Sequence, residues 1–250
     1  MESKKVMDTQ GIYYRDLNER IREAVQGGTK EIDLLNVSGQ RYIGTALAGD
    51  LKITINGVAG QDTAAFMCGP KMRINGNAQD GLANTMDKGE VYCTGMSGDV
   101  LGYAMRGGQV HVLGDVGYRA GIHMKAYKDK LPTIVIGGRA GDFLGEYMAG
   151  GIIILLGLFG AESSAPIAGK CLATGIHGGT IFVRGQIPEY QLADNLLVQE
   201  ADAEDLKMIE GFVDNFCREF GKDKSMIMDS AFLRIRPRLL RPYGNMYVPN

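Results

Sequence analysis

The chain repeats one short pattern, an apolar run that ends at a glycine and has further glycines on both sides, as in GGQVHVLG. Its 250 residues include 36 glycines, about twice the average usage. The glycines that close the runs lie 19, 19, 19, 23, 20 and 28 residues apart and are Gly57, Gly76, Gly95, Gly114, Gly137, Gly157 and Gly185. A period near 20 residues indicates a solenoid, in which one structural unit stacks on the next.

The glycines also indicate which solenoid forms. A helical array is excluded because each glycine inside a helix costs about 1 kcal/mol, and the L-x-x-L-x-L pattern of leucine-rich repeats is absent. Short strands joined by glycine corners remain, since glycine adopts the positive φ that corners demand. We therefore predict an all-β solenoid, a right-handed parallel β-helix of about seven coils over residues 39–185.

Strand alternation predicts which side chains point into the β-helix. Those four and two positions before each closing glycine are expected inside, and they are Ile53, Ile55, Met72, Ile74, Val91, Cys93, Val110, Val112, Thr133, Val135, Ile153, Leu155, Ile181 and Val183. The column between them is expected outside and reads Thr54, Arg73, Tyr92, His111, Ile134, Ile154 and Phe182. Its last three members are apolar, so another element should cover them.

Residues 1–38 are predicted to form an N-terminal helix and cap. Leu17, Ile21 and Val25 follow helical spacing, Asp16 is the expected N-cap, and Gly27 ends the helix.

Residues 186–250 are predicted to form a helix and an arginine-rich tail that pack on the rod. A helix over 201–220 carries an apolar stripe made of Leu206, Ile209, Val213, Phe216 and Phe220. We expect this helix to cover Ile154 and Phe182, and the alternative is that these two side chains contact a partner subunit or a second copy of the chain. The tail, with Arg234, Arg236, Arg238 and Arg241, is expected to continue along the rod as an extended arm.

Composition disfavours several function classes. With 27 basic and 29 acidic side chains, the chain lacks the positive balance that nucleic-acid binding needs. Its most apolar segment, 148–161, is shorter than the roughly 20 residues of a membrane helix. The four cysteines form no C-x-x-C pair and the amino terminus MESKK resembles no secretory signal, so we expect buried, reduced thiols in a cytoplasmic protein.

No residue is predicted to be catalytic, to bind a cofactor or to hold a metal. The three histidines have no second ligand at metal spacing, and GDVGYRAG does not end in the G-K-[ST] of a phosphate loop. One rival interpretation is a polysaccharide lyase or carbohydrate-binding β-helix that uses corner carboxylates beside Arg119 and Arg139, namely Asp62, Asp80, Asp99, Asp115 and Asp142. Aspartate in a glycine corner more often stabilises its own turn.

Three segments carry a resemblance to a known family: QRYIGTALAG (40–49), GVAGQDTAAFM (57–67) and GEYMAGGIIILLG (145–157). They resemble the GXGXG β-helix that forms the C-terminal domain of the glutamate synthase large subunit, here in its stand-alone form. That resemblance implies a non-catalytic structural subunit that organises a glutaminase (amidotransferase) chain and an FMN-binding synthase chain. It also implies that FMN and iron–sulfur clusters are held by these partner chains, with no cofactor on this one. The TGIHGG segment is similar to the third subunit of formylmethanofuran dehydrogenase, so a scaffold role in that enzyme is the alternative.

Two insertions depart from the period of 19 and are candidate partner contacts. One adds four residues around KAYKDKLP and includes Lys125, Lys128 and Lys130; the other adds nine and includes the loop 161–170. Ile154 and Phe182 are further candidates if no helix covers them. The alternative is that both insertions are tolerated surface loops, and the sequence leaves oligomerisation of the chain open.

Overall fold

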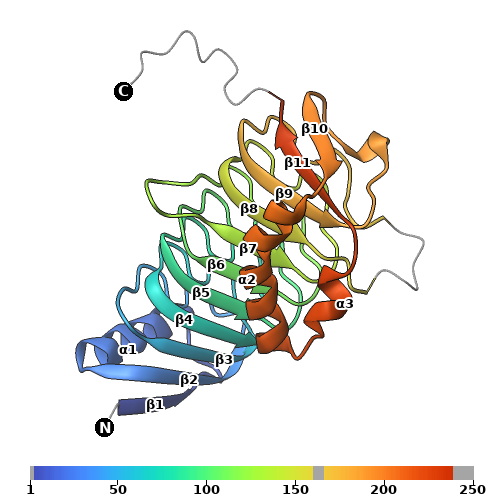
Figure 1. The fold of residues 1–250 in the computed structure, drawn as a ribbon. Helices are drawn as coiled ribbons and strands as arrows, with labels where there is room; N and C mark the ends of the chain where they lie inside the picture. Colours follow the sequence, from blue (N-terminus) through green and yellow to red (C-terminus); the bar gives the residue numbers. More distant parts are fainter. Residues whose placement is uncertain (1–2, 160–165, 239–250) are drawn as a thin grey trace.

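The computed structural model describes residues 3–159 and 166–238 and forms a parallel β-solenoid (Figure 1). One sheet runs along it in the order β1-β2-β3-β4-β5-β6-β7-β8-β9-β11-β10. The repeated strands are β3 (Lys52–Val58), β4 (Cys68–Asn75), β5 (Lys88–Cys93), β6 (Gln109–Val112), β7 (Thr133–Ile136), β8 (Ala149–Leu155) and β9 (Gly178–Arg184). Each pairs in parallel with the next. The predicted fold class is confirmed.

The sheet begins earlier than predicted. Strands β1 (Ser3–Asp8) and β2 (Thr29–Ser38) pair in parallel with each other, and β2 pairs with β3. Helix α1 (Tyr14–Gln26) connects them and buries Leu17 and Ile21. It starts at Tyr13 without a side-chain cap, so Asp16 lies in the first turn and is not the N-cap. A carboxylate there still interacts favourably with the helix dipole.

The segment before each strand alternates residues with positive and negative φ, and most of the positive-φ residues are not glycine. Each coil has three such residues at every second position, as in Asp62, Ala64 and Phe66 (φ 55°, 61° and 56°). The first and third donate backbone hydrogen bonds to the following coil, whereas the middle one donates to the preceding coil, as Ala64 does to Ile43 at 2.8 Å. These turns are therefore tied to the stack on both sides.

The interior of the solenoid holds one continuous apolar core. The predicted inward columns are confirmed in every strand except β7. There Ile134 and Ile136 lie in the core, while Val135 lies outside among a second apolar cluster, because Val112 pairs with Ile136, 24 positions later. All four β7 residues are buried, so this strand has no polar face to set the alternation, and the pair Gly137–Gly138 offered two closing glycines.

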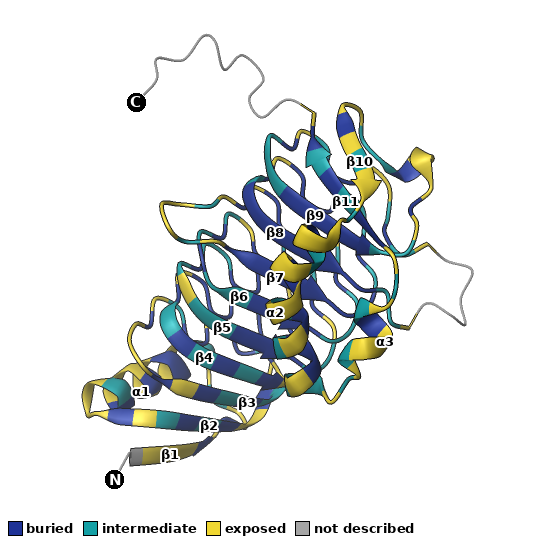
Figure 2. Cartoon of the chain, in the orientation of Figure 1, coloured by how far each residue is buried: buried dark blue, intermediate teal, exposed yellow. Residues whose placement is uncertain are grey.

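Helix α2 (Ala203–Phe220) lies across the outer face of the sheet from β9 back to β4, where Glu219 binds Lys71 and Arg73, and is followed by the short α3 (Lys224–Met228) (Figures 1 and 2). Asp202 caps α2 by accepting hydrogen bonds from the backbone of Glu204 and Asp205, and Gly221 ends it with φ 62°. The predicted helix is confirmed. It buries Ile154, Phe182 and Val135 together with its own Ile209, Val213 and Phe216.

The last strands close one end of the solenoid. After a short 3₁₀ turn, η2 (Glu189–Gln191), strand β10 (Leu196–Glu200) pairs antiparallel with β11 (Phe232–Pro237), and β11 pairs antiparallel with β9. The first part of the tail is therefore a central strand and not an arm along the rod. Arg234 and Arg236 bind the buried Asp205 of α2. Arg241 lies outside the described residues.

Candidate functional site

The candidate site lies where the turn segments of successive coils reach the strands. A column of buried side chains, Met67, Met86, Met105, Met124, Met148 and Ile176, runs along the interior. From Met86 onward, the residue after each member donates its backbone N–H to the carbonyl oxygen of the preceding member, as Arg106 does to Met86 and Lys125 to Met105. Consequently Arg106, Lys125, Ala149 and His177 occupy equivalent places in four successive coils.

Aromatic rings flank this row of side chains. The ring of His123 stacks on that of Tyr147, with centroids 5.3 Å apart, and meets the ring of Tyr103 edge-on at 5.9 Å. All three side chains are exposed, with Tyr103 at 39% and Tyr147 at 45% of their maximum. We call the surface formed by Tyr103, Arg106, His123, Lys125, Tyr147 and His177 the basic edge.

A shallow depression of about 410 Å³ is lined by the basic edge together with Ala104 and Ala149. No carboxylate lines it. Two acidic side chains of the neighbouring coils have other partners, since Asp87 pairs with Lys130 and Glu146 binds Arg119 at 2.9 Å. A third, Asp129, is exposed in the insertion turn and lies close enough to Lys130 to raise its pKa. Arg106 and Lys125 form no ion pair with any residue in 3–159 or 166–238.

The first insertion forms a turn beside the basic edge. Tyr127 and Lys130 exchange backbone hydrogen bonds of 3.1 and 3.0 Å. The structure separates the three predicted lysines: Lys125 lines the depression, Lys128 is exposed in the turn, and Lys130 is bound by Asp87. That hydrogen bond raises the pKa of Lys130. The insertion adds five residues and not four, and β7 to β8 keeps the period of 19.

The sequence did not predict that Tyr103, Arg106, Tyr147 and the two histidines are neighbours. A signal was available, because Met67, Met86 and Met105 recur at 19 residues and Met124 continues that spacing. The residues that follow these methionines, including Arg106 and Lys125, must then stack. The second insertion spans nine residues, and 160–165 lies outside the described residues.

Ile154 and Phe182 are not available as partner contacts. Both are fully buried beneath α2 and β11, so the prediction that the helix covers them is confirmed and their assignment as contacts is wrong.

His111 belongs to the same covered face. It is fully buried, stacks on Tyr92 with ring centroids 4.8 Å apart, and has Nε2 3.2 Å from Oε1 of Gln109. Burial, with the nearby charge of Lys71, lowers its pKa to about 3. His111 is therefore a neutral packing residue.

The carboxylates of the corner aspartates accept hydrogen bonds from the next coil. Oδ1 of Asp80 accepts the backbone N–H of Asp99 at 2.9 Å, and Asp99 in turn accepts that of Tyr118 at 2.8 Å. Asp115 and Asp142 do the same for Arg139 and Lys170, both at 2.7 Å. These carboxylates stabilise the corners, as expected for aspartate in turns, and the geometry does not support the lyase interpretation.

The closing glycines are required for two different reasons. Gly57 and Gly157 adopt positive φ (129° and 56°), whereas Gly114 does not. A Cβ on Gly114 would lie 2.8 Å from the carbonyl oxygen of Gly95, so close approach of the coils demands glycine there. Gly138, and not Gly137, continues this column by donating to Gly114 at 3.0 Å.

The four cysteines match the expectation of buried thiols only in part. Cys93 and Cys217 are buried, but Cys171 is exposed and Cys68 is half-buried, so the expectation of buried thiols holds for two of the four.

Within residues 3–159 and 166–238, no three His, Cys, Asp or Glu side chains gather as a metal site would require. None of the helices in this part of the chain is long and apolar enough to cross a membrane.

Comparison with known proteins identifies the family. The sequence model of the GXGXG motif matches residues 33–238. The chain belongs to the GXGXG family. It is 46% identical to an uncharacterized protein of Methanocaldococcus jannaschii over 98% of this chain and 97% of that protein.

A solved structure shares the fold of this GXGXG protein. It is a chain of the formyltransferase/hydrolase complex of Methylorubrum extorquens, determined with methylofuran bound. The TM-score is 0.51 at 19% identity, with 92% of this chain and 90% of that chain covered. At this identity the likeness extends to the fold alone.

Proposed function

We propose that this GXGXG protein is a non-catalytic structural subunit of a multi-chain glutamate synthase, and that it organises a glutaminase chain and an FMN-binding synthase chain. The observation that carries the proposal is the GXGXG match over residues 33–238, together with the segments that resemble the C-terminal β-helix of the glutamate synthase large subunit. FMN and iron–sulfur clusters would be held by the partner chains.

The architecture suits such a role. Strands β2 to β9 stack in parallel, and at about 4.8 Å per strand they span about 34 Å. Hydrogen bonds join neighbouring coils through both the strands and the turns, so the rod presents surfaces at fixed separations. Partner chains that must pass ammonia between two reaction sites need such fixed placement.

A second candidate is a scaffold subunit of a formyltransferase/hydrolase complex of the formylmethanofuran dehydrogenase type. The shared fold with a chain of the Methylorubrum extorquens complex favours it. Both candidates assign the chain a structural place within a larger enzyme and differ in the partners.

Purification of the tagged chain from its native host, followed by mass spectrometry, tests the proposal. We expect a glutaminase chain and an FMN and iron–sulfur chain to co-purify, and glutamine-dependent glutamate formation to fall when this chain is removed. Recovery of formyltransferase and hydrolase chains would support the second candidate. Both candidates would be contradicted if the chain were recovered alone and if the glutamate synthase and formyltransferase/hydrolase activities of the host were unchanged when it is removed.

A further inference from the structure

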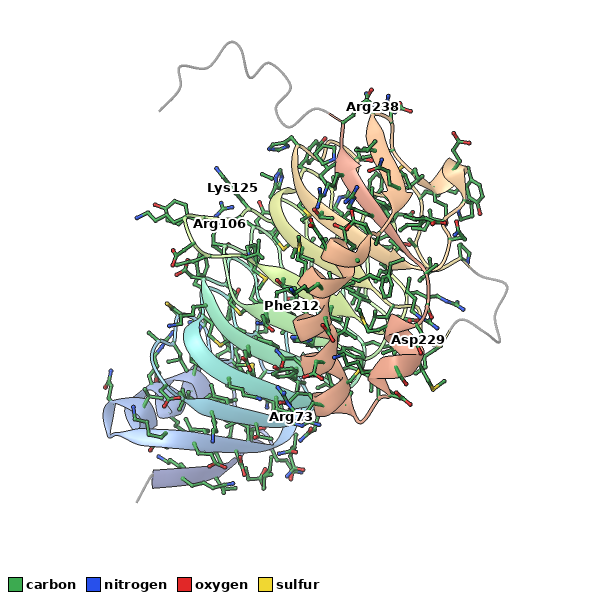
Figure 3. All side chains as sticks on the ribbon, viewed as in Figure 1. Arg73, Arg106, Lys125, Phe212, Asp229 and Arg238 are labelled. Atoms are coloured by element: carbon green, nitrogen blue, oxygen red, sulfur yellow. The ribbon has the colours of Figure 1, made fainter. Side chains whose placement is uncertain are left out.

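The basic edge has a concentrated positive charge that the chain does not neutralise. Arg106 and Lys125 follow each other in successive coils and form no ion pair within the described residues. Figure 3 shows both side chains at the same edge of the rod, far from Asp229 at the C-terminal end of α3. The nearby carboxylates of Asp87 and Glu146 are each bound by another cation. Asp129 of the insertion turn acts on Lys130 and does not line the depression.

Two alanines shape the depression between the rings and the cations. Ala104 occupies the place that His123 and Tyr147 hold in the following coils, and Ala149 lies between Lys125 and His177 in the row that begins with Arg106. A longer side chain at either position would fill the hollow. The floor is therefore small and apolar, the rim is aromatic, and the charge is positive.

We propose that the basic edge docks an extended, acidic segment of a partner chain, an inference that rests on the proposed role as a structural subunit. Carboxylates of that segment would pair with Arg106 and Lys125, and its backbone or an aromatic side chain would lie against the exposed rings of Tyr103 and Tyr147. Charge complementarity of this kind steers association and fixes the register of an interface.

The dimensions fit a segment better than a single small anion. Arg106 and His177 are three coils apart along the rod, or about 14 Å, which is the length of about four extended residues. The exposed Tyr127 and Leu131 of the neighbouring insertion, 51% and 46% exposed, extend the surface beyond the depression. Aromatic residues and arginine are enriched at protein interfaces.

The test measures binding of the full chain to a fluorescein-labelled decapeptide of alternating Glu and Gly, and to the partner chains that co-purify with it. Arg106→Glu/Lys125→Glu should weaken both interactions about tenfold or more and reduce their salt dependence. The matched control is Lys52→Glu/Lys207→Glu, which changes net charge equally at two exposed lysines on β3 and α2. It should change binding less than about twofold.

The outcomes separate this inference from the proposed function. If partners assemble but the basic-edge variant binds them as tightly as the control does, the docking inference is overturned while the proposed function stands. If no partner is recovered, the peptide measurement tests the inference alone. Weaker peptide binding by Arg106→Glu/Lys125→Glu, with unchanged binding by the control variant, supports the docking surface, and equal binding by both overturns it. Competition by inorganic phosphate or free glutamate at the peptide's own concentration would show a small-anion site and overturn the inference. Circular dichroism melting of each variant checks the fold.

Discussion

At the residue scale, the residue in the middle of each turn is matched in size to a residue on the strand of the next coil. The middle positive-φ residue of each turn is always glycine or alanine, in the order Gly44, Ala64, Ala83, Gly102, Gly121, Gly145 and Ala173. A Cβ on Gly121 would lie 2.5 Å from Cδ1 of Ile153, and one on Gly102 would lie 2.6 Å from Cδ1 of Ile134. Where the turn residue is alanine, as at Ala64 and Ala83, the equivalent strand residue is the smaller valine, Val91 or Val110.

This match predicts that Gly121→Ala destabilises the fold by about 2–4 kcal/mol, because the new methyl group overpacks the core at a positive φ. Chemical denaturation gives the free energy of unfolding. Ile153→Val alone should cost about 1 kcal/mol, but in the Gly121→Ala background it should restore stability, with a coupling of about 1 kcal/mol or more.

The reciprocal pair serves as the control. Val110→Ile should overpack against Ala83, and Ala83→Gly should relieve it. Simple additivity in both double variants would show that the size match has no energetic basis.

At the element scale, α2 converts part of an outer strand face into a second core. His111 lies under this helix, with its ring 6.5 Å from that of Phe216, and its Nδ1 has no hydrogen-bond partner within the described residues. Protonation would place a charge in this apolar layer, which is why burial lowers the pKa to about 3 from the ordinary 6.5.

The helix-covered face should therefore make the fold sensitive to acid. The unfolded chain takes up a proton at His111 near pH 6.5, whereas the folded chain does not until about pH 3. The free energy of unfolding is therefore unaffected by His111 above about pH 6.5 and decreases as the pH drops below it, by about 2 kcal/mol between pH 7 and pH 5. His111→Phe keeps a ring on Tyr92 and should remove this loss. Equal slopes of unfolding free energy against pH in both proteins would contradict the account.

The glycine period located strands β3 to β9, because the corners that bound each strand recur along the chain. The stripe containing Ile209 and Val213 located α2, because the opposite face of that helix is polar. The register of β7 could not be read, since five inserted residues precede it and Gly137 and Gly138 each offered a closing glycine. β11 was missed because its alternating arginines suggested solvent, yet Arg234 and Arg236 are bound by Asp205.

The basic edge could be predicted only in part, for a related reason. Lys125 was found because it lies in an insertion, whereas Arg106 and Tyr147 lie in coils of ordinary length. The spacing of 19 that relates Met105 to Met124 also places Arg106 beside Lys125. The places of Tyr147 and His177 depend on the five-residue and nine-residue insertions. The length of the first insertion follows only from the choice between Gly137 and Gly138, which needs the three-dimensional stack.

At the scale of the whole molecule, the two ends of the sheet are closed differently. β1 is the outer strand at the amino-terminal end and carries Lys4 and Lys5, charged residues that discourage pairing with another chain. At the other end β9 does not form an edge, because β11 pairs with it and β10 pairs with β11. Solenoids need such caps to stay soluble as single molecules.

We therefore predict that Ile235→Pro on β11 causes self-association as well as loss of stability. Ile235 is fully buried and pairs with Ile181 on β9 and Val198 on β10, so proline removes a backbone donor in the middle of a sheet, where it is hardly tolerated. The uncovered β9 edge would then pair with other copies. Sedimentation velocity over a concentration series should show growing oligomers for this variant. Gly121→Ala, destabilised but with β9 still covered, should stay monodisperse, and oligomers in both variants would point to general unfolding instead of an open edge.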